Sequence, residues 1–486
     1  MREKFYITTA IYYVNAPPHL GHALEKVQAD AIARYQRLLD REVYFLTGTD
    51  EHGIKIIHSA QSANKDIKNF VDENSAKVVE LTKKLNISND DFIRTSDKER
   101  HWPGAQLLWK KLVEAGDIYK GKYSGYYCVG CEAYVKEGDL IGGKCPYHYA
   151  EPEKIEEENY FFKLSRYADK IIKKIESGGL KILPESGKNE ILAVIRGGIE
   201  DISFSRPAEK LAGWGVPVPD DDSQLMYVWC DALANYVSAI GYGSDEKKFQ
   251  KYWPADLHII GKDILRFHAL IWPAMLLSAK SSLPKTIFVH GFIISGGKRM
   301  SKTLGNVIDP FDLIDRYGAG AVRYYLLREI TPFGDGDITE EKFKKAYNAN
   351  LANGLGNLVA RVMKMSEQYL ENKELGIMFS PKANPRRVYY ELPEDYKKLM
   401  DNFELSKTMD LIWQKISEMD LCIQKTQPFK LIKEDEEKAK KILRELVSGL
   451  WDIALMLKPF LPGTSEKIIT AIQSNKMPEA LFPRVN

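Results

Sequence analysis

The N-terminal segment shows two hydrophobic rhythms, one typical of strands and one typical of a helix. The run FYITTAIYY from Phe5 is β-branched and aromatic and predicts a buried strand, and VYFLTGTDEHG from Val43 predicts a second one. Between them, apolar residues recur at helical spacing, and these are Leu24, Val27, Ala31, Tyr35 and Leu38. The order predicts a β-α-β unit of a parallel sheet, with the polar loops HLGH and TDEHG at the carboxyl ends of the strands, where ligands collect.

The same pattern returns after a long interruption. From about Tyr119 the chain is rich in Gly, Tyr, Cys and Glu, and the strand-helix pattern resumes near MYVWCDALANY. LHIIGKDILRFHALIWPAML from Leu257 predicts strand, loop and helix, and TIFVHGFI predicts a strand that opens into the Gly-rich basic loop SGGKRMSKTLGN. We therefore expect the α/β fold class, with a Rossmann-type parallel-sheet domain split in two by an insertion.

After about Tyr347 the hydrophobic positions follow helical spacing only, which predicts a C-terminal α-helical bundle. These positions are Leu351, Leu355, Leu358, Val362 and Tyr369, then Met409, Ile412, Ile416 and Met419, then Leu443, Leu446, Leu450, Ile453 and Leu457. The expected division is 1–117 for the first half of the Rossmann-type domain, 118–225 for a connective insertion, 226–330 for the second half, 331–346 for a stem and 347–486 for the helical domain.

Length and composition agree with several folded domains. A chain of 486 residues exceeds a single hydrophobic core, and 44% hydrophobic and 28% charged residues are ordinary for a globular protein. The net charge of +2 neither demands nor excludes a nucleic-acid partner. No stretch approaches the ~18 consecutive apolar residues of a membrane span. We therefore expect a cytoplasmic protein without a membrane partner.

Three of the five cysteines lie close together beside a histidine. The cluster reads Cys128-x2-Cys131, thirteen residues, then Cys145-x2-His148. Three thiolates and one imidazole fill a tetrahedral shell without an open position, which predicts one structural zinc ion. The alternatives are a catalytic or substrate-binding metal and an empty or oxidised site. The remaining two cysteines, Cys230 and Cys422, are isolated, and we interpret both as small buried hydrophobic residues.

The segment from His19 to His22 reads HLGH and follows the first predicted strand. A loop that leads into a helix offers free backbone N–H groups and a positive dipole end to an anion, and the two histidines add further donors. Gly21 would let an adenine ring lie against the backbone. The alternative is a pair of ordinary surface histidines.

The segment from Lys298 to Asn306 reads KRMSKTLGN and follows the last predicted strand of the α/β region. A basic loop of this kind suits phosphates whose charge is neutralised at the transition state. A solvated basic loop is the alternative.

Together the two segments resemble the signature motifs HIGH and KMSKS of class I aminoacyl-tRNA synthetases, in the same order and each after a strand. Arg299 stands for the first Lys and Thr303 for the final Ser, which keeps the charge and the hydroxyl. The resemblance implies that the chain binds ATP with Mg²⁺. It also implies that His19 and His22 stabilise the α-phosphate while an amino-acid carboxylate attacks it.

The second motif supplies the cations for the leaving group. The resemblance implies that Lys302, with Arg299 and Lys298, draws off pyrophosphate, and that Gly261 and Asp263 lie at the ATP ribose.

Further segments resemble the methionyl-tRNA synthetases, and the resemblance covers essentially the whole chain: AIYYVNAPPHLGHALEKVQAD, TGTDEHGIKI, MYVWCDALANY, GKDILRFHALIWPAML and the Cys/His cluster. It implies that Asp50 holds the ammonium group of methionine. The residues it implies for the side-chain pocket are Ile11, Tyr13, Trp229, Ala232, Leu233, Tyr236 and His268. Aromatic rings suit a polarizable thioether. For the aromatic residues, plain core packing is the alternative.

The Cys/His cluster resembles the single zinc knuckle of the bacterial type in this family. In the helical region GNLVARV resembles the family's anticodon-reading stretch, which implies that Asn357 and Arg361 contact bases of tRNA(Met). Phe429 follows a Pro where the family usually has Trp, and Phe also stacks on bases. Alternatively, Asn357 caps or packs the bundle and Arg361 is a surface residue. The sequence ends without the appended module that dimerises some relatives, so we expect a monomer.

Two other functions compete with this one. The cysteinyl, leucyl or valyl synthetases would share both signature motifs, but a large editing insertion has no room here, and a cysteine-selecting zinc needs an open position. A catalytically inactive tRNA-binding protein would be expected to lack one of His19, His22, Asp50 and Lys302, and all four are present. We therefore predict an ATP-dependent methionine ligase that charges tRNA(Met).

Overall fold

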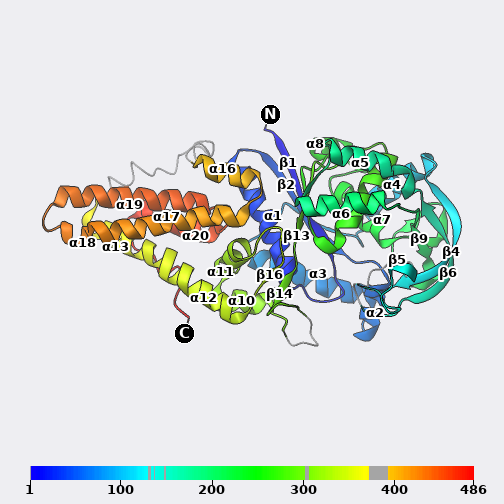
Figure 1. Cartoon of the computed structure of the whole chain (residues 1–486), viewed down its shortest axis with the longest axis horizontal. Helices are drawn as coiled ribbons and strands as arrows, with labels where there is room; N and C mark the ends of the chain where they lie inside the picture. Colours follow the sequence, from blue (N-terminus) through cyan, green and yellow to red (C-terminus); the bar gives the residue numbers. More distant parts are fainter. Residues whose placement is uncertain are drawn as a thin grey trace.

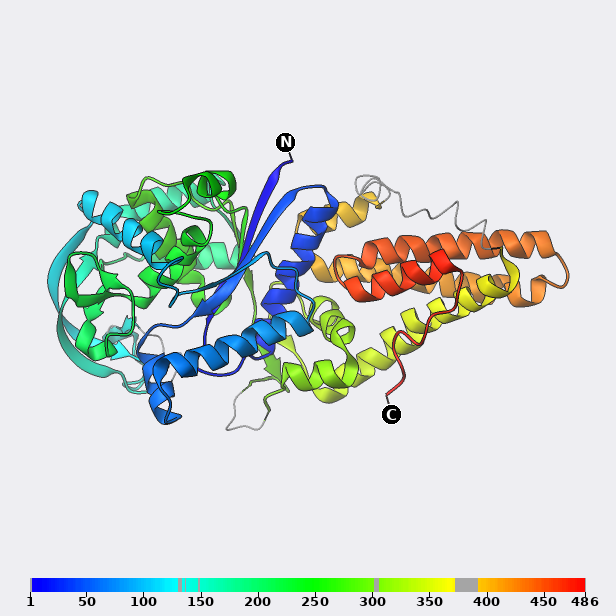
Figure 2. The same cartoon turned by 180° about the vertical axis from the view of Figure 1, so that it is seen from behind.

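The computed structural model describes residues 2–129, 133–135, 137–146, 149–300, 306–371 and 392–485. Within these residues the molecule is elongated, with an α/β part at one end and a bundle of helices at the other (Figure 1). The view from behind in Figure 2 shows helix α1 (Leu20–Leu38) at the junction between the two parts.

A six-stranded parallel sheet lies at the centre of the α/β part. Across the sheet the strands are β3 (Asp91–Arg94), β2 (Glu42–Asp50), β1 (Lys4–Tyr13), β12 (Leu257–Gly261), β13 (Thr286–His290) and β7 (Lys181–Leu183). Ile7 lies opposite Leu257, so the two halves of the domain meet at the middle of the sheet. The central strands β1, β12 and β13 are buried over nearly their whole length because helices cover both faces of a parallel sheet. The predicted Rossmann-type sheet is confirmed.

Several of the described helices accompany α1 in the two halves of this domain. They are α2 (Ile54–Ser62), α3 (Ile67–Lys84), α4 (Trp102–Glu114), α7 (Val228–Ser238), α8 (Glu246–Tyr252) and α9 (Trp272–Ser278). Helix α7 is buried over its whole length and packs against α4. Polar side chains on α7 are therefore shielded from solvent, and most groups of this kind bond to partners inside the protein.

The segment between the two halves forms two small antiparallel sheets, in the orders β5-β4-β6-β8 and β10-β11-β9. Their strands are β4 (Ile118–Cys128), β5 (Ala133–Val135), β6 (Glu153–Phe162), β8 (Ile202–Ser203), β9 (Ser205–Pro207), β10 (Pro217–Val218) and β11 (Asp221–Met226). The helices α5 (Ala168–Glu176) and α6 (Glu185–Arg196) lie in the same segment.

One strand inside the range expected for the insertion, 118–225, belongs to the central sheet instead. β7 pairs in parallel with β13, with Ile182 opposite Ile287. The strand has three residues, of which only Ile182 and Leu183 are apolar, and so short a segment shows no periodicity that would identify it as a strand. The chain therefore returns to the sheet before the predicted boundary.

The next segment leads from the sheet to the bundle. It contains β14 (Ile293–Ser295), β15 (Lys298–Arg299), α10 (Pro310–Tyr317), α11 (Ala319–Tyr324), β16 (Gly336–Asp337) and α12 (Glu340–Ala346). β14 pairs with both β15 and β16, so the predicted stem contacts the start of the basic loop.

The bundle confirms the predicted helical region. Its helices are α13 (Asn357–Tyr369), α16 (Glu394–Asp401), α17 (Leu405–Thr426), α18 (Pro428–Leu431), α19 (Glu436–Leu457) and α20 (Pro462–Ser474). Every apolar position predicted to face the core is buried except Tyr369, which is half-buried. Among the described helices, none is both long and apolar enough to cross a membrane.

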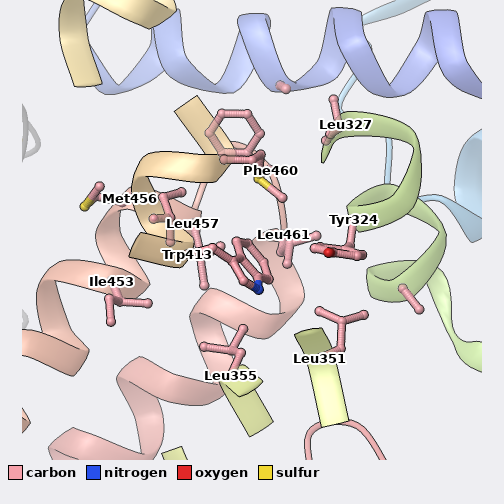
Figure 3. Close-up of a cluster of buried hydrophobic side chains, with 14 of the residues drawn as sticks. Tyr324, Leu327, Leu351, Leu355, Trp413, Ile453, Met456, Leu457, Phe460 and Leu461 are labelled. Carbon is pink, nitrogen blue, oxygen red and sulfur yellow. The ribbon is translucent and has the colours of Figure 1, made fainter. Parts of the chain in front are cut away.

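The core of the bundle continues into the α/β part without a break. Figure 3 shows Tyr324 and Leu327, three residues apart in the segment that leads from the sheet to the bundle, gathered with Trp413 and Phe460 of the bundle. The rings of Tyr324 and Trp413 lie 4.8 Å apart. Because the two parts share apolar surface, we expect them to hold a fixed orientation.

Candidate functional site

The two histidines of HLGH form the N-terminal cap of α1. The Nδ1 atom of His19 accepts a hydrogen bond from the N–H of Gly21 at 3.1 Å, and Nδ1 of His22 accepts one from the N–H of His19 at 3.3 Å. The two rings stack with centroids 3.8 Å apart. With both Nδ1 atoms accepting, each neutral ring carries its proton on Nε2. The cap therefore leaves two N–H donors beside the helix N-terminus.

The environment keeps these rings neutral. Desolvation lowers the pKa of His19 and lowers that of His22 well below its ordinary value. A side chain at Gly21 would place its Cβ 2.9 Å from Cε1 of His19. The glycine at position 21 therefore leaves room for the His19 ring that caps α1. Inspection of the sequence missed this local role of Gly21.

A buried pair behind this cap, Glu25 and His290, was also missed. Glu25 accepts hydrogen bonds from the N–H of Ala10 at 2.7 Å and from the hydroxyl of Tyr12 at 3.0 Å, and its other oxygen lies 3.0 Å from Nε2 of His290. Burial favours a neutral ring, but the Glu25 carboxylate outweighs it and raises the pKa of His290. Two features of the sequence could have indicated this pair. They are a glutamate one helical turn after HLGH and a histidine at the end of a predicted strand.

The residues predicted for the ATP ribose lie next to this pair. Gly261 ends β12, and a Cβ there would lie 2.7 Å from a carboxylate oxygen of Asp263 and 3.7 Å from the His290 ring. Gly261, Asp263 and His290 therefore meet at the carboxyl edge of the sheet. Gly261 ends β12, which is next to the strand that leads to His19, Asp263 follows β12, and His290 ends β13, one strand further along.

Four residues predicted for the side-chain pocket come together. The ring of Trp229 lies 6.5 Å from that of Tyr13 and 6.2 Å from that of His268, in edge-to-face geometry. The hydroxyl of Tyr236 lies 2.8 Å from Nε2 of His268. A further ring that was missed, Phe267, stacks on Trp229 at 3.7 Å. The tertiary structure thus builds one aromatic cluster from β1, α7 and the segment after β12.

The proton positions in this cluster follow from the contacts. Nδ1 of His268 lies 3.0 Å from the carbonyl oxygen of Ile264 and donates to it, so Nε2 accepts from Tyr236. Burial lowers the pKa of His268 to about 4. Among the residues that the structure describes, no acceptor faces the buried indole N–H of Trp229. The cluster is therefore uncharged at neutral pH and retains one N–H donor.

The other predicted pocket residues border this cluster. Asp50 ends β2 beside Tyr13 of β1 and is 2% exposed. Ile11 is half-buried on β1, and Ala232 and Leu233 are buried on α7. A nearly buried carboxylate at the edge of an aromatic cluster suits a ligand with a cationic and an apolar end.

The predicted zinc shell lies partly outside the described residues. Cys128 and Cys145 are buried, one at the end of β4 and the other in a turn where its carbonyl accepts from the N–H of Tyr149 at 2.8 Å. Cys131 and His148 are not described, and within the described ranges no group of three potential ligands lies together. The buried thiols fit a structural zinc in their chemistry, and the site stays a prediction.

The basic loop is described only at its start. Lys298 is exposed and Gly296 and Gly297 form the turn before it, both with positive φ. Arg299 is placed only as part of β15, and Lys302 lies outside the described residues. The contacts of the basic loop to phosphates therefore stay a prediction.

The three predicted anticodon residues all lie on the bundle. Asn357 is exposed at the start of α13, and Arg361 forms an ion pair of 3.0 Å with Asp420 of α17. Phe429 is 45% exposed on α18, directly after α17. An exposed ring and a guanidinium are both groups that suit unpaired bases.

Comparison with known proteins agrees with this geometry. Residues 5–154 and 139–363 match the family described as tRNA synthetases class I (M). The chain is 43% identical to the methionine–tRNA ligase of Thermotoga maritima, over 98% of this chain and 76% of that protein. It is also 43% identical to the methionine–tRNA ligase of Brucella melitensis biotype 1, over 96% and 91%.

Solved structures show the same relationship. Mycobacterium tuberculosis methionyl-tRNA synthetase in complex with methionyl-adenylate is 35% identical and superposes with a TM-score of 0.89 over 100% of this chain and 99% of that one. The apo form of the same enzyme is 33% identical, with a TM-score of 0.81 over 100% and 99%. The chain therefore belongs to the class I tRNA synthetases, in the family of the methionine–tRNA ligases.

Proposed function

We propose that this chain activates methionine with ATP and then transfers it to the 3′-terminal adenosine of tRNA(Met). In the first step the methionine carboxylate attacks the α-phosphorus of ATP, an O–P bond forms, and pyrophosphate leaves. In the second step a ribose hydroxyl of the tRNA attacks the activated carbonyl and AMP leaves. The observation that carries the proposal is the uncharged aromatic cluster with Asp50 at its edge.

Methionine would lie between Asp50 and the cluster. The Asp50 carboxylate would hold the ammonium group, and Trp229, Tyr236 and His268 would surround the thioether. The other predicted lining residues are Ile11, Tyr13, Ala232 and Leu233. A sulfur–aromatic contact contributes about 0.3 to 1.5 kcal/mol. An apolar pocket separates ligands that differ by one methylene by only about 1 to 3 kcal/mol, so homocysteine would be activated weakly.

ATP would bind at the carboxyl edge near the cap of α1. The Nε2–H groups of His19 and His22 would donate to the α-phosphate as negative charge builds up, beside the helix dipole. Gly21 would approach the adenine, and Gly261 and Asp263 the ribose. Lys298, Arg299 and Lys302 would stabilise the leaving pyrophosphate, and Mg²⁺ would neutralise phosphate charge.

Several finer assignments belong to the same proposal. Cys128, Cys131, Cys145 and His148 would hold one structural Zn²⁺. Asn357, Arg361 and Phe429 would read the anticodon, with Arg361 exchanging its contact to Asp420 for a base. The monomeric state, the cytoplasmic location and the domain division stay predictions.

The proposal is tested by amino-acid-dependent exchange of pyrophosphate into ATP. Methionine, leucine, valine, cysteine and homocysteine are compared, with Lys302→Ala as the inactive control. We expect exchange with methionine far above the others and its loss in the variant. Silence with methionine rejects the proposal, and a stronger response to another amino acid rejects the pocket assignment.

A further inference from the structure

A buried carboxylate on α7, Asp231, is shared by two histidines from other parts of the fold. One carboxylate oxygen lies 2.6 Å from Nδ1 of His52, and the other lies 2.6 Å from Nε2 of His101. All three side chains are at most 3% exposed. Burial alone would raise the pKa of Asp231, but the two imidazoles facing it lower it on balance. The carboxylate therefore acts as an anion that accepts from two rings.

The two histidines connect Asp231 to different parts of the fold. His52 follows β2 by two residues, and its backbone N–H donates to the carboxylate of Asp50 at 3.3 Å. His101 precedes α4, and its Nδ1 lies 2.8 Å from the hydroxyl of Ser238, which is on α7 itself. Of these two branches, the one through His52 connects α7 to Asp50, the residue that ends β2.

The His52 branch is also held from its other side. The ring of Trp214 meets the His52 ring edge-to-face with centroids 5.7 Å apart, and its indole N–H donates to the carbonyl of Glu51 at 2.6 Å. Glu51 lies between Asp50 and His52 in the chain. This loop is thus fixed through its backbone and its imidazole, while α7 supplies the negative charge.

The distance from Asp50 to α7 determines what fits between them. Trp229 and Tyr236, two of the rings of the aromatic cluster, are on α7 on either side of Asp231. An amino acid held by its ammonium at Asp50 and by its side chain at these rings must span that distance. A displacement of about 1 Å in such a frame costs on the order of a hundredfold in rate.

We infer that Asp231, acting through His52, is a positioning residue that sets Asp50 against α7 and so determines affinity for the amino-acid substrate. The inference rests on the proposed function, because it assumes that the ligand spans Asp50 and the aromatic cluster. Asp231 itself does not touch that ligand. Its effect is on the substrate that bridges the two elements, whereas ATP binds at the α1 cap and does not depend on this spacing.

The two histidines offer a matched pair for the test. His52→Leu and His101→Leu each remove one ring from the same carboxylate and leave a side chain of similar bulk. His52→Asn keeps an N–H donor near the position of Nδ1 and serves as the conservative rescue. Pyrophosphate exchange gives KM for methionine, KM for ATP and kcat, and thermal unfolding gives the structural cost of each variant.

We expect Asp231→Asn and His52→Leu to raise KM for methionine by about tenfold or more, with KM for ATP unchanged. His52→Asn recovers most of the affinity. His101→Leu lowers the melting temperature as much as His52→Leu does but leaves KM for methionine close to the wild-type value. If His52→Leu does not fold, His52→Gln is used in its place. The amide nitrogen of glutamine cannot reach the position of Nδ1, so this variant also loses the hydrogen bond to Asp231.

Equal effects of His52→Leu and His101→Leu on KM for methionine would overturn the inference, because the network would then act only on stability. An unchanged KM in Asp231→Asn would overturn it as well. A wild-type protein with no methionine-dependent exchange rejects the proposed function, and the inference with it. If the wild type shows methionine-dependent exchange and KM for methionine is unaltered in the variants, the inference is rejected but the proposed function is not.

Discussion

Asp30 of α1 and Arg323 of α11 form an ion pair of 2.7 Å with both side chains at most 1% exposed. Arg323 also donates to the carbonyl oxygens of Phe460 at 2.6 Å and Pro459 at 3.2 Å, which lie between α19 and α20. The helix that begins at the HLGH cap is therefore tied to the bundle through one guanidinium. The planar guanidinium of Arg presents several N–H donors in a fixed geometry, so it suits several simultaneous acceptors better than the ammonium of Lys does.

Removal of this guanidinium should destabilise the whole molecule. We expect Arg323→Met to cost at least about 1.5 to 3 kcal/mol, because the buried Asp30 carboxylate then keeps, among the described residues, only Arg34, 2.8 Å away, as its cation. The carbonyl oxygens of Phe460 and Pro459 lose their donor as well. Thermal and urea unfolding measure the loss. Lys188→Met, which breaks an exposed contact to Glu185, serves as the control and should leave the melting temperature unchanged. A melting temperature of Arg323→Met equal to the wild type would contradict the prediction.

The Tyr236 hydroxyl should matter for methionine more than for stability. In Tyr236→Phe the buried Nε2 of His268 loses its donor, at a cost of about 1 to 3 kcal/mol, and we expect KM for methionine to rise. The matched control is Tyr6→Phe, which removes the buried hydroxyl that donates to the Tyr236 carbonyl at 2.7 Å. The pocket assignment is supported if the two variants lose similar stability but only Tyr236→Phe changes KM for methionine. Parallel changes in KM in both variants count against it.

The lowered pKa of His268 predicts a dependence of stability on pH. Its pKa is about 4 in the folded protein and 6.5 as the ordinary value, so the unfolded chain binds the proton more readily. The contribution is fully present above pH 6.5 and is lost as the pH falls towards 4, by about 3 kcal/mol in total. We expect the wild type to lose stability relative to His268→Gln over this range in chemical unfolding. A constant difference would show that the ring is not neutral and buried.

Metal removal distinguishes a structural zinc from a catalytic one. We expect one zinc per chain by elemental analysis, and none in Cys145→Ser. A chelator should lower the melting temperature, while KM for methionine in any residual folded protein stays unchanged, because a closed shell takes no part in catalysis. Loss of exchange activity without any loss of folded structure would point to a catalytic metal instead.

The exposed ring of Phe429 should affect tRNA and not amino-acid activation. Loss of one stacked base costs about 1 to 3 kcal/mol, so we expect Phe429→Ala to raise KM for tRNA(Met) in aminoacylation by about tenfold or more. Pyrophosphate exchange stays at the wild-type level. Val113→Ala, at a similarly exposed apolar residue of α4, should change neither. An unchanged KM for tRNA in Phe429→Ala removes this residue from the anticodon site.

The sequence alone determined the local elements and the motifs they carry. Alternation and helical spacing are local properties, so the strands, the bundle and the place of HLGH at a strand end were predictable. The residues of the aromatic cluster, apart from Phe267, followed from resemblance to a family. Periodicity by itself does not separate Trp229 or Tyr236 from ordinary core residues, since both are buried in a wholly buried helix.

Only the tertiary structure decided which distant residues meet. β7 joined the central sheet, Phe267 stacked on Trp229, and the bundle shared its core with the α/β part. Hydrophobic spacing indicates which face of an element is buried, but burial of apolar surface is non-directional, so spacing does not say which distant element covers that face. Asp231 shows the same limit for polar groups. Its two histidine partners are 179 and 130 residues away in the chain. A buried charge requires partners, but the fold alone selects them.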